Sequence, residues 1–165
     1  MKQIKINYRL FVAISAIVMS CNKPNKNVSM ENINSSIFPV GNKVDNKNFV
    51  GNAYLQVLTE RDKNNDYVIG SVTFDPGARN NWHSHPKGQV LLVTEGEGIY
   101  QERGKPARRI KKGDIVKIPE NTEHWHGATI ENKLVHIAVT NYEGDSNSSW
   151  FEPVNENDYK QANEL

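Results

Sequence analysis

The chain has 165 residues, which is enough for one domain with a substantial core and not for two. Its 20 basic and 19 acidic residues leave a net charge of +1, and the basic residues cluster nowhere beyond the adjacent pairs at 108–109 and 111–112. Because domains that bind nucleic acid concentrate positive charge on one surface, this balance argues against a nucleic-acid partner.

The N-terminal segment has the pattern of an export signal. Basic residues at positions 2, 5 and 9 precede the run LFVAISAIVMS. This run of about 12 apolar or small residues is too short for a membrane span, which needs about 20. Cys21 follows directly, in an arrangement that resembles a bacterial lipobox, where a signal peptidase cuts before a cysteine that carries the lipid. We therefore expect an export signal at 1–20 and an exported bacterial lipoprotein, anchored to the membrane through a lipid on Cys21.

Cys21 is the only cysteine, so no disulfide can form within the chain. The alternative for this residue is a buried free thiol in a core element. The residues that follow are mostly polar and rich in Asn and Lys, a composition that disfavours regular structure. We therefore expect a flexible polar tether at 21–48, in which the only apolar patch, Ile37 to Val40, is a candidate first edge strand.

From Phe49 onward the sequence changes to short alternating apolar runs that turn residues separate. Many short strands at close spacing favour an antiparallel sandwich or a small barrel. No window shows a sustained helical period, so a helix is expected only as a short, fraying turn after Pro153. We predict a single all-β domain over 49–165, with strands near 53–59, 67–74, 89–94, 97–102, 107–111, 114–118, 124–129 and 133–140.

All five histidines lie in this strand-rich region. His83 and His85, like His124 and His126, are two positions apart, and on an extended strand such residues point to the same face. Imidazole is the commonest protein ligand for several divalent metals, so two such pairs in one sandwich predict a metal site. His136 lies on one side of an otherwise apolar strand and needs a partner, because an unpaired buried polar group costs about 1–3 kcal/mol.

Other conspicuous side chains have structural interpretations. Trp82 and Trp125 have the opposite strand parity from the histidines beside them, so we expect them to pack on the other face. Tyr100 is expected to contribute cross-strand packing rather than to line a pocket. Arg79 precedes the histidines in a loop, and we expect it to be a solvated surface residue, with contact to a carboxylate substrate as the alternative.

Two motifs resemble those of the cupin family. The matching residues are Gly77, His83, His85, Gln89 and Gly96 in the first motif and Gly113, Pro119, Asn121 and His124 in the second. Gln89 stands where the first motif usually has an acidic ligand, and Asn121 stands where the second has a glycine. Asparagine tolerates the left-handed backbone conformation better than most residues, so the second change is conservative. The resemblance implies an antiparallel β-barrel of jelly-roll type with a short C-terminal helical turn.

Residues 50–160 are similar, more narrowly, to small single-domain cupins often described as carboxymuconolactone-decarboxylase-like, which include manganese-dependent hydroxynitrile lyases. This resemblance implies one divalent metal, with Mn²⁺ or Fe²⁺ favoured and Zn²⁺ or Ni²⁺ also open. It also implies a small-molecule substrate, and it leaves a homodimer open because dimers are common among cupins. The implied metal ligands are His83, His85, Gln89 and His124, and the implied pocket residues, which are the candidate catalytic groups, are His126 and His136.

A glutamine ligand would shape the chemistry of such a centre. Gln89 would bind through a neutral carbonyl oxygen and leave the charge of the metal uncompensated, which makes it a stronger Lewis acid. The set also departs from the two-histidine, one-carboxylate triad of many non-haem iron oxygenases. We therefore expect Lewis-acid chemistry of lyase, isomerase or decarboxylase type on a small oxygenated organic molecule, with His126 or His136 moving a proton. An iron-dependent dioxygenase of quercetinase-like type and a non-catalytic module that binds a sugar or an acid remain as alternatives.

Overall fold

The computed structural model describes residues 36–44 and 47–165. The expected export signal, Cys21 and the tether as far as residue 35 lie outside the described residues. The elements, in chain order, are β1 (Asn42–Lys43), β2 (Phe49–Val50), β3 (Ala53–Thr59), β4 (Tyr67–Phe74), β5 (Arg79–Asn80), β6 (His83–Ser84), β7 (Gln89–Glu102), β8 (Arg108–Lys111), β9 (Ile115–Ile118), β10 (His124–Ala128), β11 (Leu134–Asn141), β12 (Ser149–Trp150) and α1 (Glu156–Asn163).

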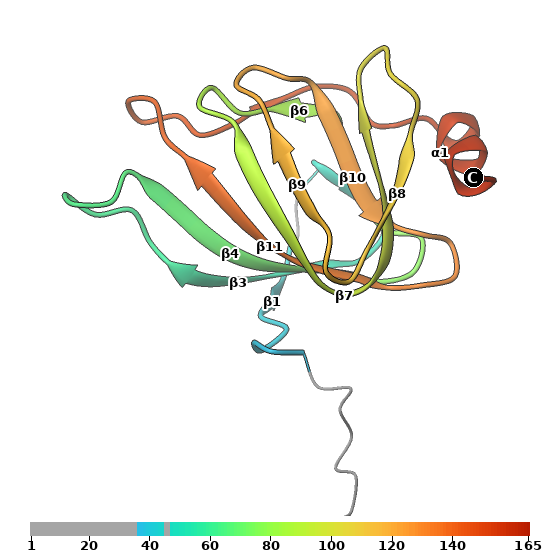
Figure 1. Ribbon diagram of the computed structural model, residues 1–165, viewed down its shortest axis with the longest axis horizontal. Helices are drawn as coiled ribbons and strands as arrows, with labels where there is room; N and C mark the ends of the chain where they lie inside the picture. The colour runs from blue at the N-terminus through green and yellow to red at the C-terminus, as the bar shows by residue number, and fades with distance from the viewer. Residues whose placement is uncertain (1–35, 45–46) are drawn as a thin grey trace, which may run out of the picture. The chain divides into compact units, whose positions relative to one another are not determined.

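The strands form a curled antiparallel sheet, shown in Figure 1. Its path runs β1-β3-β4-β11-β7-β10-β5-β2, and β8 and β9 pair with opposite halves of β7. The strand β11 lies between β4 and β7 and pairs with both. The all-β antiparallel architecture predicted from the alternating pattern is confirmed, as is the helical element at the C-terminal end.

The two strands expected at 89–94 and 97–102 are one continuous strand, β7. Gly96 has a φ of 74°, and a Cβ placed there would lie 1.9 Å from the carbonyl oxygen of Lys133. The pairing of β7 with β11 shifts register beside Val135 and His136. A bulge and a left-handed glycine bend a strand without ending its ladder. The break expected between the strands at 89–94 and 97–102 is therefore a bend within one strand.

Two apolar clusters stabilise the sheet on its two faces. The inner cluster includes Phe74, Leu91, Val93, Tyr100, Val116 and Leu134. The second cluster contains Trp82, Ile99 and Trp125 from the sheet and Val154, Tyr159 and Ala162 from the C-terminal region. Trp82 and Trp125 therefore pack away from the inner face, as their strand parity predicted.

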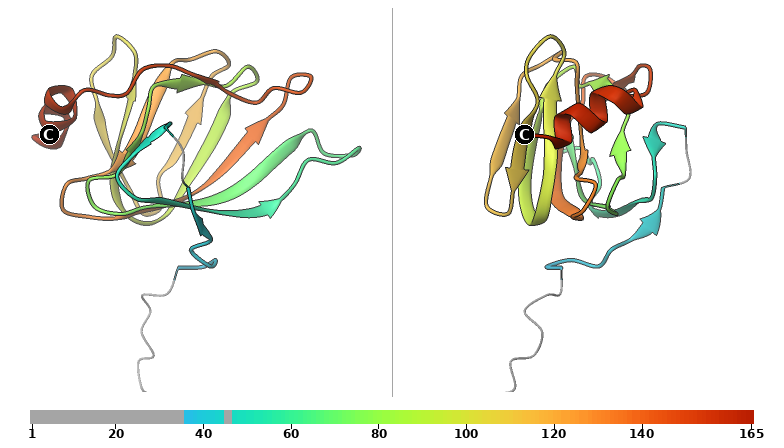
Figure 2. Two further views of the ribbon diagram at one scale, coloured as in Figure 1. Left: turned by 180° about the vertical axis from the view of Figure 1, so that it is seen from behind. Right: turned by 90° about the vertical axis from the view of Figure 1, so that its right-hand side faces the viewer.

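The C-terminal helix is longer than the fraying turn expected from the sequence, and a cap and a tertiary contact stabilise it. Asn155 caps α1 by accepting a hydrogen bond of 2.8 Å from the backbone N–H of Asp158. Tyr159 is buried and donates its hydroxyl to the carbonyl of Ala128 at 2.8 Å. Figure 2 shows α1 beside the sheet at one end of the strands. The apolar side chains Tyr159 and Ala162, which are three positions apart, give the short helix a buried stripe.

Arg79 was expected from the sequence to be a solvated surface residue, and the structure shows that it is buried. Its side chain is 3% exposed, and Nη2 lies 2.5 Å from Oε1 of Glu156 on α1. Its guanidinium carbon also lies 4.1 Å from the ring centre of Tyr159. The partner of this arginine is far away in the sequence, so no local pattern around Arg79 identifies it.

The N-terminal edge of the sheet also differs from the expectation. The apolar patch Ile37 to Val40 forms no strand, and the first strand is β1, which lies within the expected tether and pairs with β3. In the part of the chain that the structure describes, no helix is long and apolar enough to cross a membrane.

Candidate metal centre

The sheet brings three histidines from two strands together. β6 and β10 pair antiparallel so that His124 lies opposite His83. His85 follows β6, and its carbonyl accepts hydrogen bonds from the backbone N–H groups of Gly88 (3.1 Å) and Asn121 (2.8 Å). Asn121 has a φ of 57° and is the only non-glycine residue with a positive φ among those described, which fits an asparagine in a glycine position. The turns that carry the two motifs thus lock together at His85.

One nitrogen from each of His83, His85 and His124 lies within 4.8 Å of the other two. The three side chains are 2%, 5% and 0% exposed, so water does not surround these nitrogens. The ring centres of His83 and His124 are 4.1 Å apart, and those of His83 and His85 are 5.0 Å apart. Converging buried imidazoles at this spacing could hold a single divalent cation.

Backbone carbonyls select the tautomer of all three rings. Nδ1 lies 3.0 Å from the Asn81 carbonyl in His83, 2.6 Å from the Asn147 carbonyl in His85 and 2.8 Å from the Thr122 carbonyl in His124. A carbonyl only accepts, so each Nδ1 carries the proton and each Nε2 keeps a lone pair. Nε2 of His85 and Nε2 of His124 are buried without a hydrogen-bond partner among the described residues. These two nitrogens have lone pairs that no hydrogen-bond donor occupies, which fits a cation bound between them.

Burial keeps these three rings neutral at neutral pH. Burial lowers the pKa of His124 to about 4, and burial together with the neighbouring His124 and His85 lowers the pKa of His83 well below 6.5. Burial also lowers the pKa of His85, and its hydrogen bond to the Asn147 carbonyl partly opposes that shift. A neutral ring is the form that binds a metal.

Gln89 lies at the start of β7 beside this cluster. Its Nε2 donates a hydrogen bond of 2.8 Å to Oγ1 of Thr140, which leaves Oε1 as the free end of the amide. Oε1 is buried, and within the described residues it makes no hydrogen bond of ordinary geometry. Three neutral nitrogens and one neutral oxygen therefore fit a first-row divalent metal, and the assignment of these four residues as its ligands stays a prediction.

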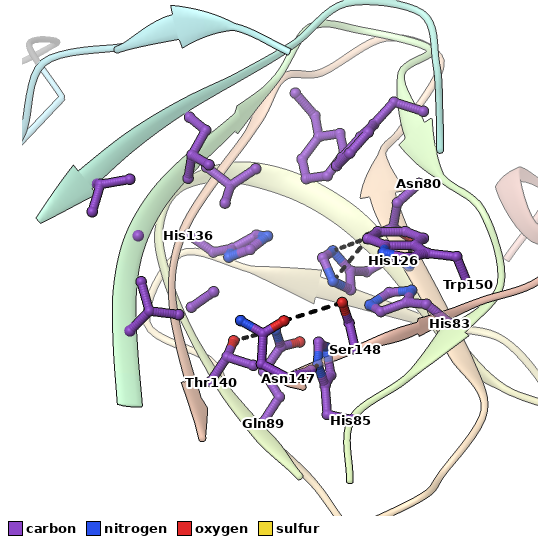
Figure 3. A pocket seen from close by; sticks show the side chains of 18 residues that line it. Asn80, His83, His85, Gln89, His126, His136, Thr140, Asn147, Ser148 and Trp150 are labelled. Carbon is purple, nitrogen blue, oxygen red and sulfur yellow. Dashed lines mark hydrogen bonds between the residues drawn. The ribbon is translucent and has the colours of Figure 1, made fainter. Parts of the chain in front are cut away.

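A cavity of about 220 Å³ lies beside the histidines (Figure 3). Its polar wall includes His83, His85 and Gln89. None of the described residues that line it carries a formal charge. The opposite, apolar wall comes from β3, β4 and β11 and consists of Leu55, Val57, Val68, Val72 and Ala138, and the aromatic lining residues are Phe49, Phe74 and Trp150.

Both candidate catalytic histidines line this cavity. His126 is contacted by Asn80, and the ring centres of His126 and His136 are 4.8 Å apart. Neither ring nitrogen of His136 has a hydrogen-bond partner of ordinary geometry in the described part of the chain. Burial lowers the pKa of His136 to about 4, and burial together with the neighbouring histidines lowers the pKa of His126 well below 6.5. The structure thus brings both rings to the predicted pocket, while their catalytic role stays a prediction.

Several residues that shape the site were not found from the sequence. Thr140 has the same strand parity as His136, so its inward direction could have been inferred. Trp150 stacks on His83 with ring centres 4.7 Å apart, and β12 pairs with β6. Asn147 contributes only its carbonyl, a group that every residue has, so no sequence signal identifies it. The segment 143–152, called here the strap, therefore completes the surroundings of two of the histidines.

Comparisons with known proteins agree with this geometry. Residues 70–140 match the family described as the cupin domain. The (R)-mandelonitrile lyase of Granulicella tundricola is 40% identical over 91 residues, which cover 55% of this chain and 70% of that protein. An acireductone dioxygenase of Bacillus cytotoxicus is 28% identical over 61 residues, which cover 34% of this chain and 36% of that protein.

A solved structure is also similar. The crystal structure of a cupin-like protein from Thermotoga maritima has a TM-score of 0.74 and 45% sequence identity, and the match covers 79% of this chain and 98% of that one. The curled sheet, the three-histidine cluster and these matches to cupins over the same strands agree with one another. The chain therefore belongs to the cupin family.

Proposed function

We propose that this chain is a metal-dependent lyase that cleaves a small, uncharged α-hydroxy compound carrying an apolar group. The observation that carries the proposal is the pairing of a three-histidine cluster with a cavity whose described lining has no formal charge. A dicarboxylate or a phosphorylated substrate would find no cationic side chain there. An aromatic or aliphatic group would bury apolar surface against the wall formed by β3 and β4.

The similarity to an (R)-mandelonitrile lyase supports the reaction type. Mandelonitrile is uncharged and combines an aromatic ring with a hydroxyl group on the carbon that bears the nitrile. We propose Mn²⁺ or Fe²⁺ as the resident metal, held by His83, His85, Gln89 and His124. When bound, the metal would stabilise negative charge on a substrate oxygen.

The chain's own residues would perform the remaining tasks. The apolar wall binds the organic group and excludes water. The carbonyls that accept from Nδ1 hold the rings of His83, His85 and His124 in one tautomer and orientation, so their lone pairs need no rearrangement before they bind. His126 and His136 are within the cavity and would hold or move the hydroxyl proton.

A second candidate is an iron-dependent dioxygenase, which the similarity to an acireductone dioxygenase favours. The match covers 36% of that protein, and the neutral Gln89 distinguishes this site from a centre with a carboxylate ligand. A carboxylate would lower the net charge of the metal and favour oxidation states above two, whereas a neutral amide does not. The lyase is therefore the preferred proposal.

The test is an assay of protein loaded separately with Mn²⁺ and Fe²⁺, with the metal content measured by elemental analysis. We expect cyanide release from uncharged aromatic α-hydroxynitriles without oxygen uptake, and loss of both metal and activity in His124→Ala. Oxygen consumption without cyanide release would favour the dioxygenase. Tight binding of a sugar or an acid without turnover of any substrate would favour the binding module.

A further inference from the structure

The apolar wall of the cavity has its smallest side chains at its centre. Gly70 of β4 lies opposite Ala138 of β11 on one side and opposite Val57 of β3 on the other. Residues opposite one another in an antiparallel ladder point to the same face, so Gly70 and Ala138 lie side by side on the cavity wall. The rows above and below them hold larger residues that also line the cavity, namely Leu55, Val72 and His136 in one row and Val68 and Thr140 in the other.

The backbone does not require glycine at position 70. Gly70 lies inside β4, pairs on both sides and has no positive φ. The register shift between β3 and β4 falls on β3, between Val57 and Thr59. A glycine inside a strand weakens the strand, and it marks a bulge or a place where another group comes close to the backbone. Because the bulge is on the other strand, we looked for the group that comes close to Gly70.

That group is the side chain of Leu55. A Cβ at position 70 would lie 2.8 Å from Cδ1 of Leu55, and the next atom, the Gln56 carbonyl oxygen, would be 3.8 Å away. Leu55 is 39% exposed, and its Cδ1 is the flexible end of the side chain. Glycine at 70 therefore lets Leu55 lie against the β4 backbone. A larger residue at 70 would push Leu55 away from the wall and reduce the room in front of Ala138.

The size of the cavity fits one aromatic ring with a short polar end. Its volume is about 220 Å³. An apolar protein cavity of about 150 Å³ holds one benzene ring. Along β11, Ala138 lies between His136 and Thr140, which both line the cavity (Figure 3). A ring against Ala138 would therefore have His136 on one side and, on the other, Thr140, whose hydroxyl accepts a hydrogen bond from Gln89.

We propose that Gly70, Leu55 and Ala138 set the size of the substrate, so that the cavity accepts one aryl ring and excludes two fused rings. The proposal rests on the proposed lyase function and names its substrate class, the aryl α-hydroxynitriles with a single ring. The ring packs against Ala138 and Leu55, and the hydroxyl and nitrile groups face the histidines. The three residues act on the choice of substrate and not on the bonds that break.

The first test measures binding without turnover. Benzyl alcohol carries one ring, 2-naphthylmethanol carries two fused rings, and neither has a nitrile to lose. Carbon-13 methyl spectra of the zinc-loaded protein, which is diamagnetic, give the dissociation constants. Benzyl alcohol should shift the methyl signal of Ala138, and 2-naphthylmethanol should bind about tenfold more weakly. Gly70→Val should weaken the binding of benzyl alcohol by about tenfold, and Leu55→Ala should strengthen that of 2-naphthylmethanol by a similar factor.

A compensating variant separates this role from a general loss of structure. Gly70→Val combined with Leu55→Ala removes the side chain that a larger residue at 70 would displace. It should restore the affinity for benzyl alcohol to within about threefold of that of the unaltered protein. Ala138→Leu fills the same space from β11 and keeps the test decisive if Gly70→Val does not fold. Val139→Leu, which enlarges the next residue of β11 on the opposite face of the sheet, is the matched control and should leave both affinities unchanged.

The second test uses turnover by the manganese-loaded protein. It compares mandelonitrile with 2-hydroxypropanenitrile, which carries a methyl group in place of the ring. The ratio of their kcat/KM values should fall by about tenfold in Gly70→Val and in Ala138→Leu, mainly through the KM for mandelonitrile. Val139→Leu should keep the ratio of the unaltered protein.

The two proposals fail in different ways. Equal affinity of the unaltered protein for the two alcohols would overturn the size limit. Unchanged binding of benzyl alcohol in both Gly70→Val and Ala138→Leu would overturn the role of these residues. Failure of the unaltered, metal-loaded protein to cleave any α-hydroxynitrile would overturn the proposed function, and the methyl spectra would still decide which residues limit the cavity.

Discussion

At the scale of single residues, the candidate centre depends on groups that are neutral. Three imidazoles keep their lone pairs because backbone carbonyls accept their Nδ1 protons, and Gln89 keeps its oxygen free because Thr140 accepts from its nitrogen. A donor set without charge leaves the full charge of a divalent cation available to a substrate oxygen. Replacing Gln89 tests this electrostatic argument directly.

Gln89→Glu keeps the size and reach of the side chain and adds one negative charge. We expect equal or higher metal content, because a carboxylate attracts the cation more strongly. Binding of anionic inhibitors should weaken and the pH–rate profile should move, because the lower net charge raises the pKa of a bound water. Inhibitor titration and rate measurements across pH check this, with the exposed Gln161→Glu as control. Unchanged anion affinity would mean that Gln89 does not contact the metal.

His136 predicts how the stability of the metal-free protein depends on pH. Burial lowers its pKa from 6.5 to about 4, so the unfolded chain binds more protons than the folded chain between these values. The stability that neutral His136 provides is present above pH 6.5 and is lost as the pH falls toward about 4. At about 1.4 kcal/mol per pKa unit, the change is about 3 kcal/mol. Urea unfolding of His136→Leu should show a shallower pH dependence than the unaltered protein, and an identical slope would contradict the prediction.

At the scale of elements, the strap and α1 hold the site from outside the sheet. The strap pairs with β6 through β12 and places Trp150 against His83. The helix α1 holds β5 through the contact between Arg79 and Glu156, and β5 presents Asn80 to His126. Elements after the last long strand therefore position residues that lie more than 60 positions earlier in the chain.

Trp150 tests the contribution of the strap. Trp150→Leu removes an aromatic ring stacked on a proposed ligand, and such ring pairs contribute about 0.5–1.5 kcal/mol. We expect metal affinity to fall by about threefold to tenfold, because His83 loses part of its orientation. Competition titration with a metal-binding dye measures this. Phe151→Leu, which changes the neighbouring exposed aromatic residue, should leave the affinity unchanged; equal effects of the two variants would argue against the role of the strap.

At the scale of the whole molecule, we propose that residues 1–20 direct export, that Cys21 carries a lipid, and that a polar tether precedes the cupin domain. β1 at Asn42–Lys43 shows that the last part of the expected tether joins the sheet. A single lipid chain binds membranes only marginally, so stable anchoring would require more than one chain on Cys21.

Cys21→Ser should move the protein from the membrane fraction to the soluble fraction or leave it as an uncleaved precursor. Cell fractionation and mass spectrometry of the N-terminus measure both outcomes, and Ser20→Ala, which keeps a small residue before the cysteine, is the control. Cytosolic protein that retains residues 1–20 would refute the assignment.

The sequence by itself determined the all-β class and the inner face of the strands, because strand parity and turn residues are local properties. Which of the histidines converge was implied by the resemblance of the two motifs to those of cupins. The spacing around Gly77–Gly96 and Gly113–His124 was sufficient to indicate a cupin before any contact was known. Gln89 was recognisable for the same reason, since it occupies a position defined by the motif.

Only the tertiary structure decided which groups act on those histidines. The carbonyl of Asn147, the ring of Trp150 and the amide of Asn80 reach their histidines from segments 46 to 67 positions away. Arg79 looked like a surface residue because its partners, Glu156 and Tyr159, lie on a helix near the end of the chain. Contacts between distant segments form only when the sheet curls and closes around its core, and a backbone carbonyl leaves no mark on the sequence that supplies it.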